Sequence, residues 1–449
     1  MTMANPSEDP CMGTDALRQG RIRGRSSAVL CLILGLLTMG PYSPPDLCYR
    51  SDMYDASCRI VVSSEGEVRR GTPDIAPLDF DGQALVWCDV GPGGSEVMLS
   101  VSAGNDFGPP VRVSESAAVS QKPRVTCSPD GAIHVLWEEQ EAGAEPEVFY
   151  RSSVDSGQTF TTPPRNLSEN TGRSTDPDIF AGPAGRIHVV WTDDTPGVPS
   201  AMYRVSVDGG ASFSSAVNLS GNAQPDRVLH AVVAEDAGGK IVAAWSEERT
   251  GGGRVLIARS SDGGSSFAKL TEVFGSPSCH PQHLACLASP LTSTFWHVAW
   301  NETDSLESPD ESRVWLFSFD ESQFGRPDEI PVVSHVPVTA GLSFEGLGGV
   351  DLHTNGFEAI LVFEGRKESG RREIFFGHFY DSPDWIGLVE LSRVAGEGEY
   401  GIDRDAAGLA QDFRSPRGGN PAVFEDDTGI WFGKGEPLPN ELTMNWGCR

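Results

Sequence analysis

Basic residues are scarce in this chain of 449 residues. Lys and Arg number 34 against 63 Asp and Glu, which gives a formal net charge of −29 at pH 7. A chain this acidic repels the phosphate backbone of nucleic acids and the anionic surface of membranes. The composition therefore argues against a nucleic-acid partner.

Long helices and the common catalytic fingerprints are also missing. Gly (51 residues) and Pro (32 residues) are too frequent for coiled coils, and the glycines lack the fixed period of collagen. The chain contains no G-x-S-x-G elbow, P-loop, HExxH motif or dinucleotide-binding fingerprint. These absences argue against the enzyme classes that depend on those motifs.

The apolar run near the N-terminus, Ala28 to Met39, is shorter than the roughly 20 residues that a membrane span needs. Arginines precede it, and Gly40 and Pro41 follow it, a pattern typical of a secretory signal. No clean cleavage site follows, so an uncleaved N-terminal anchor is the alternative. We expect residues 1–45 to be a signal peptide or anchor and 46–57 a linker, which makes the protein secreted or periplasmic.

The cysteines beyond this leader are odd in number. They are Cys48, Cys58, Cys88, Cys127, Cys279, Cys286 and Cys448. A chain of this length does not need disulfides to fold, and an odd count leaves at least one thiol unpaired within the chain. Cys48 with Cys58 and Cys279 with Cys286 are close enough for local disulfides, but spacing does not establish either pair.

Short apolar runs that end in an aromatic residue recur along the chain. They end at Trp87, Trp137, Trp191, Trp245, Trp300, Phe363 and Phe424. The runs are rich in Val and bounded by Gly, Asp and Pro, which is typical of buried strands. The recurrence predicts one unit of four strands used seven times.

The two ends of this repeat complement each other. The last unit lacks an outer strand after Phe424, and the segment 58–63 (CRIVVS) precedes the first unit at the spacing of an outer strand. We therefore expect an all-β, seven-bladed β-propeller of four-stranded blades over residues 58–435, closed by this N-terminal strand pairing with the C-terminal blade. Residues 436–449 form the expected C-terminal tail, and tandem β-sandwich domains are the alternative.

The pattern S-x-D-x-G-x-x-F occurs three times at one position in the unit. The copies are Ser153, Asp155, Gly157 and Phe160; Ser206, Asp208, Gly210 and Phe213; and Ser260, Asp262, Gly264 and Phe267. Over nearly the whole mature chain this resembles the BNR or Asp-box family, whose best-known members are sialidases. Asp can accept hydrogen bonds from its own turn and Gly permits positive φ, so we expect the boxes to be structural. Calcium binding by the boxes is the alternative.

The resemblance also implies three arginines on inner strands that hold the carboxylate of sialic acid. At the matching positions, just after three aligned prolines, the sequence has Asp74, Arg124 and Asp178, with Arg227 near the corresponding place in the fourth unit. The arginine-isoleucine-proline motif of the family is absent, and sialidase propellers have six blades. These departures argue against sialidase activity, and no catalytic residue is assigned.

A carboxylate follows the aromatic by two residues in most units. These carboxylates are Asp89, Glu139, Asp193, Glu247, Glu302 and Asp426. Strand geometry places them at one height, near the loops after the second strands, where they would form an acidic rim for metal ions, cationic groups or sugar hydroxyls. In the alternative interpretation each carboxylate bonds its own turn or the next blade.

Histidines gather near the first strands of the fourth to sixth units. His230, His280, His283 and His353 are candidate ligands of a transition metal in the central channel. Ordinary polar histidines beside a Cys279–Cys286 disulfide are the alternative. His134, His188 and His297 each stand three residues before an aromatic, which predicts packing inside the blades.

Together these patterns predict an extracytoplasmic Asp-box propeller that recognises a glycan or protein on the face formed by the loops after the second strands. The first alternative is a glycoside hydrolase of sialidase-like type that uses two rim carboxylates. The second is a structural or assembly scaffold. Calcium and a transition metal are the only cofactors considered, and no membrane span is expected beyond the N-terminal anchor.

Overall fold

The computed structural model describes the predicted repeat region in segments. These are residues 60–61, 69–78, 82–91, 94–103, 106–195, 197–221, 225–250, 252–276, 280–288, 295–303, 312–320, 332–337, 346–354, 359–366, 372–379, 387–390, 408–409, 421–426 and 429–434. Within these segments the regular structure consists of β-strands without a helix, so the predicted all-β class is confirmed. No helix capable of crossing a membrane occurs in this part of the chain. The predicted leader, linker and tail lie outside it.

The first strands of the chain form consecutive antiparallel sheets. Sheet 1 contains β2 (Arg69–Pro77), β3 (Gly82–Gly91), β4 (Gly94–Ala103), β5 (Asp106–Phe107) and β6 (Val111–Arg112). Sheet 2 contains β7 (Val119–Cys127), β8 (Ile133–Gln140), β9 (Glu147–Ser153) and β10 (Arg165–Asn166). Sheet 3 contains β11 (Ser174–Ala181), β12 (Ile187–Asp193), β13 (Ser200–Ser206) and β14 (Val217–Asn218). Strands β2 to β10 are connected as one nine-stranded sheet, which we divide into sheets 1 and 2 where a single parallel residue pair, Ser95 with Val119, joins β4 to β7.

The later strands repeat this order. Sheet 4 contains β15 (Arg227–Glu235), β16 (Ile241–Arg249), β17 (Gly252–Ser260) and β18 (Ala268–Ser276). Sheet 5 contains β19 (His280–Ala288), β20 (Phe295–Thr303), β21 (Ser312–Asp320) and β22 (Val332–Pro337). Sheet 6 contains β23 (Gly346–Thr354), β24 (Ala359–Arg366), β25 (Arg372–Phe379) and β26 (Gly387–Glu390). Sheet 7 contains β27 (Gly408–Leu409), β28 (Pro421–Asp426), β29 (Gly429–Lys434) and the N-terminal β1 (Ile60–Val61).

The two ends of the described chain meet in sheet 7. There β1 pairs antiparallel with β29, so that Ile60 lies opposite Phe432 and Val61 opposite Trp431. Ile60 and Val61, which belong to the segment expected to supply an outer strand, therefore lie at the outer edge of the last sheet.

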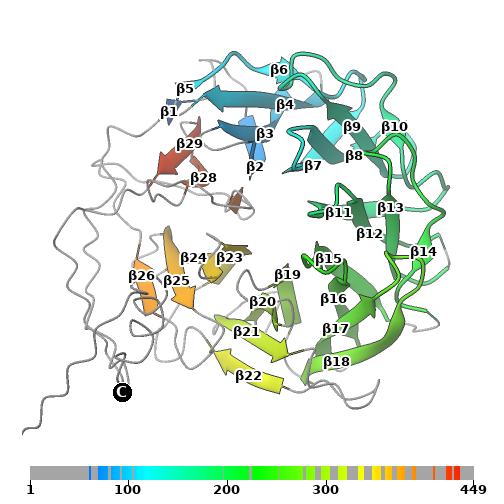
Figure 1. Cartoon of the computed structure of the whole chain (residues 1–449), viewed down its shortest axis with the longest axis vertical. Coiled ribbons are helices and arrows are strands. Elements are labelled where there is room, and N and C mark those ends of the chain that lie inside the picture. Colours follow the sequence, from blue (N-terminus) through cyan, green and yellow to red (C-terminus); the bar gives the residue numbers. More distant parts are fainter. Residues whose placement is uncertain are drawn as a thin grey trace, which may run out of the picture.

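The sheets stand around a common centre, with the first strand of each sheet innermost (Figure 1). Successive first strands contact one another from β2 through β7, β11, β15 and β19 to β23, and β27 contacts both β23 and β2. Residues far apart in the sequence are thereby brought side by side along the inner strands.

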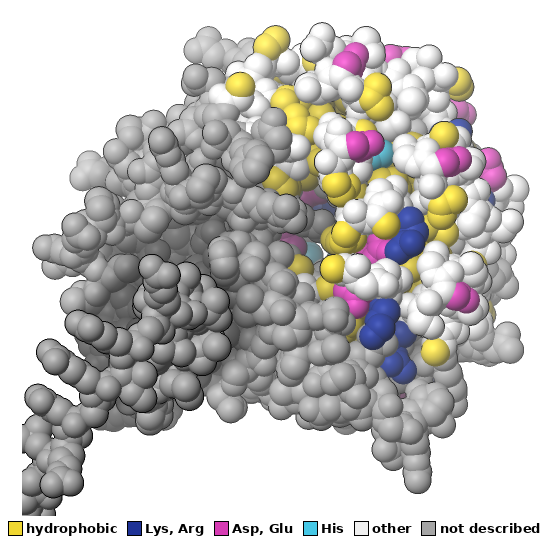
Figure 2. Space-filling model, viewed as in Figure 1, with side chains coloured by type: hydrophobic (Ala, Val, Ile, Leu, Met, Phe, Trp, Pro, Cys, Tyr) yellow, Lys and Arg dark blue, Asp and Glu magenta, His cyan; other side chains and the backbone are white. Residues whose placement is uncertain are grey.

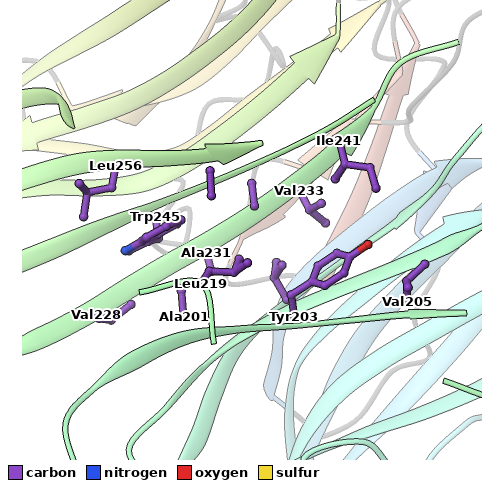
Figure 3. Close-up of a cluster of buried hydrophobic side chains, with 13 residues drawn as sticks. Ala201, Tyr203, Val205, Leu219, Val228, Ala231, Val233, Ile241, Trp245 and Leu256 are labelled. Atoms are coloured by element: carbon purple, nitrogen blue, oxygen red, sulfur yellow. The ribbon is translucent and has the colours of Figure 1, made fainter. Parts of the chain in front are cut away.

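The recurring aromatic residues lie on the second strands, as the pattern predicts. Trp87, Trp137, Trp191, Trp245 and Trp300 are fully buried. In Figure 3, Tyr203 of β13 and Trp245 of β16 belong to one cluster of apolar side chains packed between sheets 3 and 4. Burial of side chains of this size stabilises the fold by about 1.5 to 3 kcal/mol each.

Candidate functional site

The turns of the S-x-D-x-G-x-x-F pattern, which we call boxes, satisfy their own polar groups. In the first box, the Ser153 hydroxyl donates to Asp155 Oδ1 at 2.7 Å and accepts from the Gly157 amide at 2.9 Å. The Thr159 amide and hydroxyl donate to the two carboxylate oxygens of Asp155 at 2.8 and 2.6 Å. The bonds from Thr159 lower the pKa of Asp155 to about 2, and the boxes of Asp208 and Asp262 repeat this arrangement.

Each of the later boxes also contacts the preceding sheet. A Cβ atom at Gly210 would overlap the hydroxyl of Tyr150, and the ring of Phe213 meets Tyr150 edge-on at a centroid distance of 5.0 Å. The Tyr150 hydroxyl in turn lies 2.7 Å from His134 Nδ1 inside sheet 2. The box is therefore part of the packing between neighbouring sheets, at the end of the sheets where the second strands begin.

Four of the carboxylates two residues after the aromatics accept hydrogen bonds from the tryptophans themselves. The indole Nε1 of Trp137 donates to Glu139 at 2.8 Å, that of Trp191 to Asp193 at 2.9 Å, and equivalent bonds join Trp87 to Asp89 and Trp245 to Glu247. A buried indole N–H needs an acceptor, which explains the recurring spacing.

These carboxylates do not form an exposed rim. Glu139, Asp193, Glu247 and Glu302 are buried, and Asp89 is half-buried. Arg249 and Arg254 pair with Glu247, at 2.5 Å for Arg254. Figure 2 shows acidic and basic side chains side by side on one face of the molecule. The side chain of Asp426 lies outside the described residues.

The inner-strand residues Asp74, Arg124 and Asp178 lie on β2, β7 and β11. Asp74 accepts a hydrogen bond from the Val125 amide at 2.8 Å, and Asp178 accepts one from the Val233 amide at 3.2 Å, so each connects its strand to another first strand. Burial raises the pKa of both carboxyls, to about 7 for Asp178, and the charge of Arg124 opposes the rise. Arg227 pairs instead with Glu248 at 3.2 Å.

A second set of inner-strand residues has an unusual backbone. Lys122, Asp176, His230 and His283 have φ angles of 49°, 51°, 49° and 47°. They occupy the same place, a β-bulge, in the consecutive first strands β7, β11, β15 and β19. The left-handed region costs a residue with a side chain roughly 1 to 2 kcal/mol. We call these four residues the inner-strand row.

Contacts run along the inner-strand row. Lys122 Nζ lies 2.5 Å from Asp176 Oδ1. Although burial opposes ionisation, the charges of His230 and Lys122 hold the pKa of Asp176 below its usual value. The rings of His230 and His283 lie 4.8 Å apart, centroid to centroid, at an interplanar angle of 31°. A cation, a carboxylate and two imidazoles are therefore neighbours at the end of the inner strands where the second strands finish.

The predicted metal ligands separate in the structure. His230 and His283 are neighbours, whereas His280 Nδ1 lies 3.5 Å from Glu248 Oε1, and the side chain of His353 is outside the described residues. The described part of the chain holds no group of three or more His, Cys, Asp or Glu residues arranged to bind a metal ion.

Cys286 of β19 is a free thiol. The disulfide with Cys279 that the sequence offered as an alternative is therefore not formed. Burial, together with the negative charge of Asp178, raises the pKa of the Cys286 thiol, which keeps it protonated and a poor nucleophile.

Sequence reasoning did not identify Lys122, Asp176 or the Glu138 that contacts both. One signal was present, because Lys122 and Asp176 directly precede the aligned prolines Pro123 and Pro177. The strain at these positions depends on the bulge, which the sequence pattern did not reveal.

No protein-family model matches the chain, and none of the curated proteins matches it in sequence. Solved structures share its fold. A PL25 ulvan lyase bound to -[GlcA(1-4)Rha3S]- is 11% identical, with a TM-score of 0.54 over 84% of this chain and 96% of the lyase. The polysaccharide lyase Uly1 is 10% identical, with a TM-score of 0.54 over 89% of this chain and 94% of the lyase.

A Hadza microbial sialidase, Hz136, is 13% identical and has a TM-score of 0.46 over 77% of this chain and 74% of the sialidase. The likeness to the two lyases defines the class of this protein as an all-β protein of radially arranged sheets. At these identities the likeness concerns the fold alone.

Proposed function

We propose that this protein is a closed, seven-bladed Asp-box β-propeller, located outside the cytoplasm, that binds a glycan over the inner-strand row. Closure is supported by the pairing of β1 with β29 and by the contacts of β27 with β23 and β2. The Asp-box assignment is supported by the identical hydrogen bonds of the three turns.

The strained backbone of the inner-strand row carries the proposal of a binding site there. Four residues with side chains adopt positive φ at one repeated position, although glycine would relieve the strain at each of them. Strain of this kind gathers at ligand sites, where it places particular side chains. Lys122, Asp176, His230 and His283 together offer donors and acceptors that match the hydroxyl groups of a sugar.

A glycan-array screen tests this proposal with His230→Asn, because Asn tolerates left-handed φ better than other residues with side chains. We expect the wild type to bind at least one glycan class and His230→Asn to bind it about tenfold more weakly, as for the loss of one hydrogen bond. Val207→Ser is the matched control, since Val207 is exposed on an Asp-box turn at the other end of the sheets. Equal binding by all three proteins would reject the site.

A second candidate function is polysaccharide cleavage by β-elimination, the reaction type of the two lyases that share the fold. The neighbouring imidazoles of His230 and His283 favour it, because elimination needs a base that removes the C5 proton of a uronate and an acid that protonates the departing oxygen as the C4–O bond breaks. The cations Lys122 and Arg124 could neutralise the uronate carboxylate. Hydrolysis by the predicted rim carboxylates has less support, because Glu139, Asp193 and Glu247 are buried and accept hydrogen bonds from tryptophans.

Elimination has a distinctive product. A polymer of -[GlcA(1-4)Rha3S]- incubated with the protein would yield a 4,5-unsaturated uronate, which absorbs ultraviolet light, whereas hydrolysis yields a new reducing end without that absorbance. Absence of the unsaturated product, on this polymer and on other uronate-containing polysaccharides, would reject this candidate and leave the binding proposal intact.

A further inference from the structure

Glu138 of β8 lies beneath the inner-strand row and is fully buried. It is adjacent to Glu139 in the sequence, but side chains of successive strand residues point to opposite faces. Glu139 accepts hydrogen bonds from Trp137 of its own strand and Ser120 of β7, whereas Glu138 accepts from Gln121 of β7 and from Asp176 of β11 in the next sheet. Two buried carboxylates of one strand therefore have different surroundings.

Three donors from the inner strands converge on Glu138. Its Oε1 accepts from the backbone amide of Asp176 at 2.6 Å and lies 3.1 Å from Lys122 Nζ. Its Oε2 accepts from Gln121 Nε2 at 2.9 Å. Burying a charged carboxylate costs free energy unless such donors satisfy it. The loss of one of these contacts is therefore expected to weaken the others.

The contacts of Glu138 fall on the two strained residues of sheets 2 and 3. Lys122 has its ammonium bonded to Glu138, and Asp176 has its backbone amide bonded to the same carboxylate. On the second strands of sheets 3 and 4 the corresponding positions hold Thr192 and Ser246, whose hydroxyls donate to the backbone of their own sheets. No carboxylate therefore takes the place of Glu138 on these two second strands.

Lys122 remains accessible at the same time. Its side chain is 37% exposed, while that of Glu138 is 1% exposed. An ammonium group has three N–H donors, and Asp176 and Glu138 take two of them. The third is left for a group that approaches from solvent.

We propose that Glu138 is a positioning residue of the glycan site, which from inside sheet 2 holds the Lys122 ammonium and the Asp176 backbone so that one Lys122 donor is presented to the ligand. This inference rests on the proposed function for the ligand, but the bracing itself can be measured without one. Burial alone would lower the pKa of Lys122, and the carboxylates of Asp176 and Glu138 raise it above its usual value.

The ligand-free test is competitive acetylation of lysine amines, read by mass spectrometry at Lys122. Glu138→Gln keeps the volume and an acceptor for the Asp176 amide but removes the charge. Losing one of two close carboxylates lowers a lysine pKa by about one unit, so we expect Lys122 to be labelled about tenfold faster at pH 9. Glu139→Gln is the matched control, with the same change one residue along the strand, and it should leave labelling at Lys122 unchanged.

The functional test uses the same glycan array with Glu138→Gln, Lys122→Met and the double variant. If Glu138 acts through Lys122, the double variant binds no more weakly than Lys122→Met alone. Additive losses, or equal Lys122 labelling in the wild type and Glu138→Gln, would overturn the inference. A wild type that binds no glycan would reject the proposed function while the labelling result stands. If Glu138→Gln fails to fold, Glu138→Asp keeps the charge but withdraws it from Lys122 by one methylene group; faster Lys122 labelling in Glu138→Asp supports the positioning role, and unchanged labelling overturns it.

Discussion

Acid should destabilise this protein through a buried histidine of sheet 2. His134 has no exposed surface, and its ring nitrogens lie 2.7 Å from the Tyr150 hydroxyl and 3.1 Å from the Ser128 hydroxyl. Both partners are neutral. Burial lowers the pKa of His134 to about 4 from an ordinary value of 6.5, although the charge of Asp130 acts in the opposite direction.

Acid lowers the stability because the folded and unfolded states bind protons at His134 over different pH ranges. Between pH 6.5 and 4 the unfolded chain binds a proton at His134 and the folded chain does not, so acid favours unfolding. The difference between the ordinary pKa of 6.5 and the folded-state pKa of about 4, at about 1.36 kcal/mol per unit, predicts a loss of about 3 kcal/mol in the free energy of unfolding by pH 4. Above pH 6.5 His134 is neutral in both states and the full stability is retained.

The assay compares the wild type with His134→Gln, which keeps a donor and an acceptor in the ring's place and has no proton to gain. Urea unfolding is followed by tryptophan fluorescence at pH 7, 6, 5 and 4. Carboxylates titrate alike in both proteins, so their effects cancel in the difference. We expect the wild type to lose about 3 kcal/mol more than His134→Gln over this range. Parallel profiles from pH 7 to 4 would refute the reasoning.

Two further changes test the packing. Gly210→Ala places a methyl group on the Tyr150 hydroxyl at a φ of +86°, and should destabilise the fold by about 2 to 4 kcal/mol in urea unfolding. The control is Gly209→Ala, where φ is positive and the space is open, and it should destabilise the fold by about 1 kcal/mol. Equal losses in the two variants would contradict the predicted overlap. Trp137→Phe leaves buried Glu139 without its indole donor and should lower the free energy of unfolding by about 1 to 3 kcal/mol beyond the effect of the smaller apolar area. The double variant with Glu139→Gln should recover part of that loss in thermal denaturation. No recovery would count against a stabilising Trp137–Glu139 hydrogen bond.

The strands and turns were readable because their causes are local. A run such as HVLW before Glu138 needs only its own residues to favour a buried strand, and the Asp155 turn is held by donors within a few positions of it. The spacing of Trp137 and Glu139 was equally visible, but the direction of the carboxylate was not. It points to the indole inside the sheet, because the buried N–H requires an acceptor.

Sequence by itself determined the all-β repeat, the positions of its second strands and the turns of the S-x-D-x-G-x-x-F pattern, since periodicity and turn chemistry act over a few residues. The sequence also pointed to His230 and His283 of the candidate site, but tertiary structure alone added Lys122, Asp176 and Glu138 to them. Lys122 and Asp176 are 54 positions apart and meet because successive first strands lie side by side around the centre. Each bulge that gives these residues positive φ is a register shift between paired strands of one sheet, and the buried Glu138 contacts Lys122 within sheet 2 and Asp176 across to sheet 3, so both features depend on strand pairing and packing that no local pattern encodes.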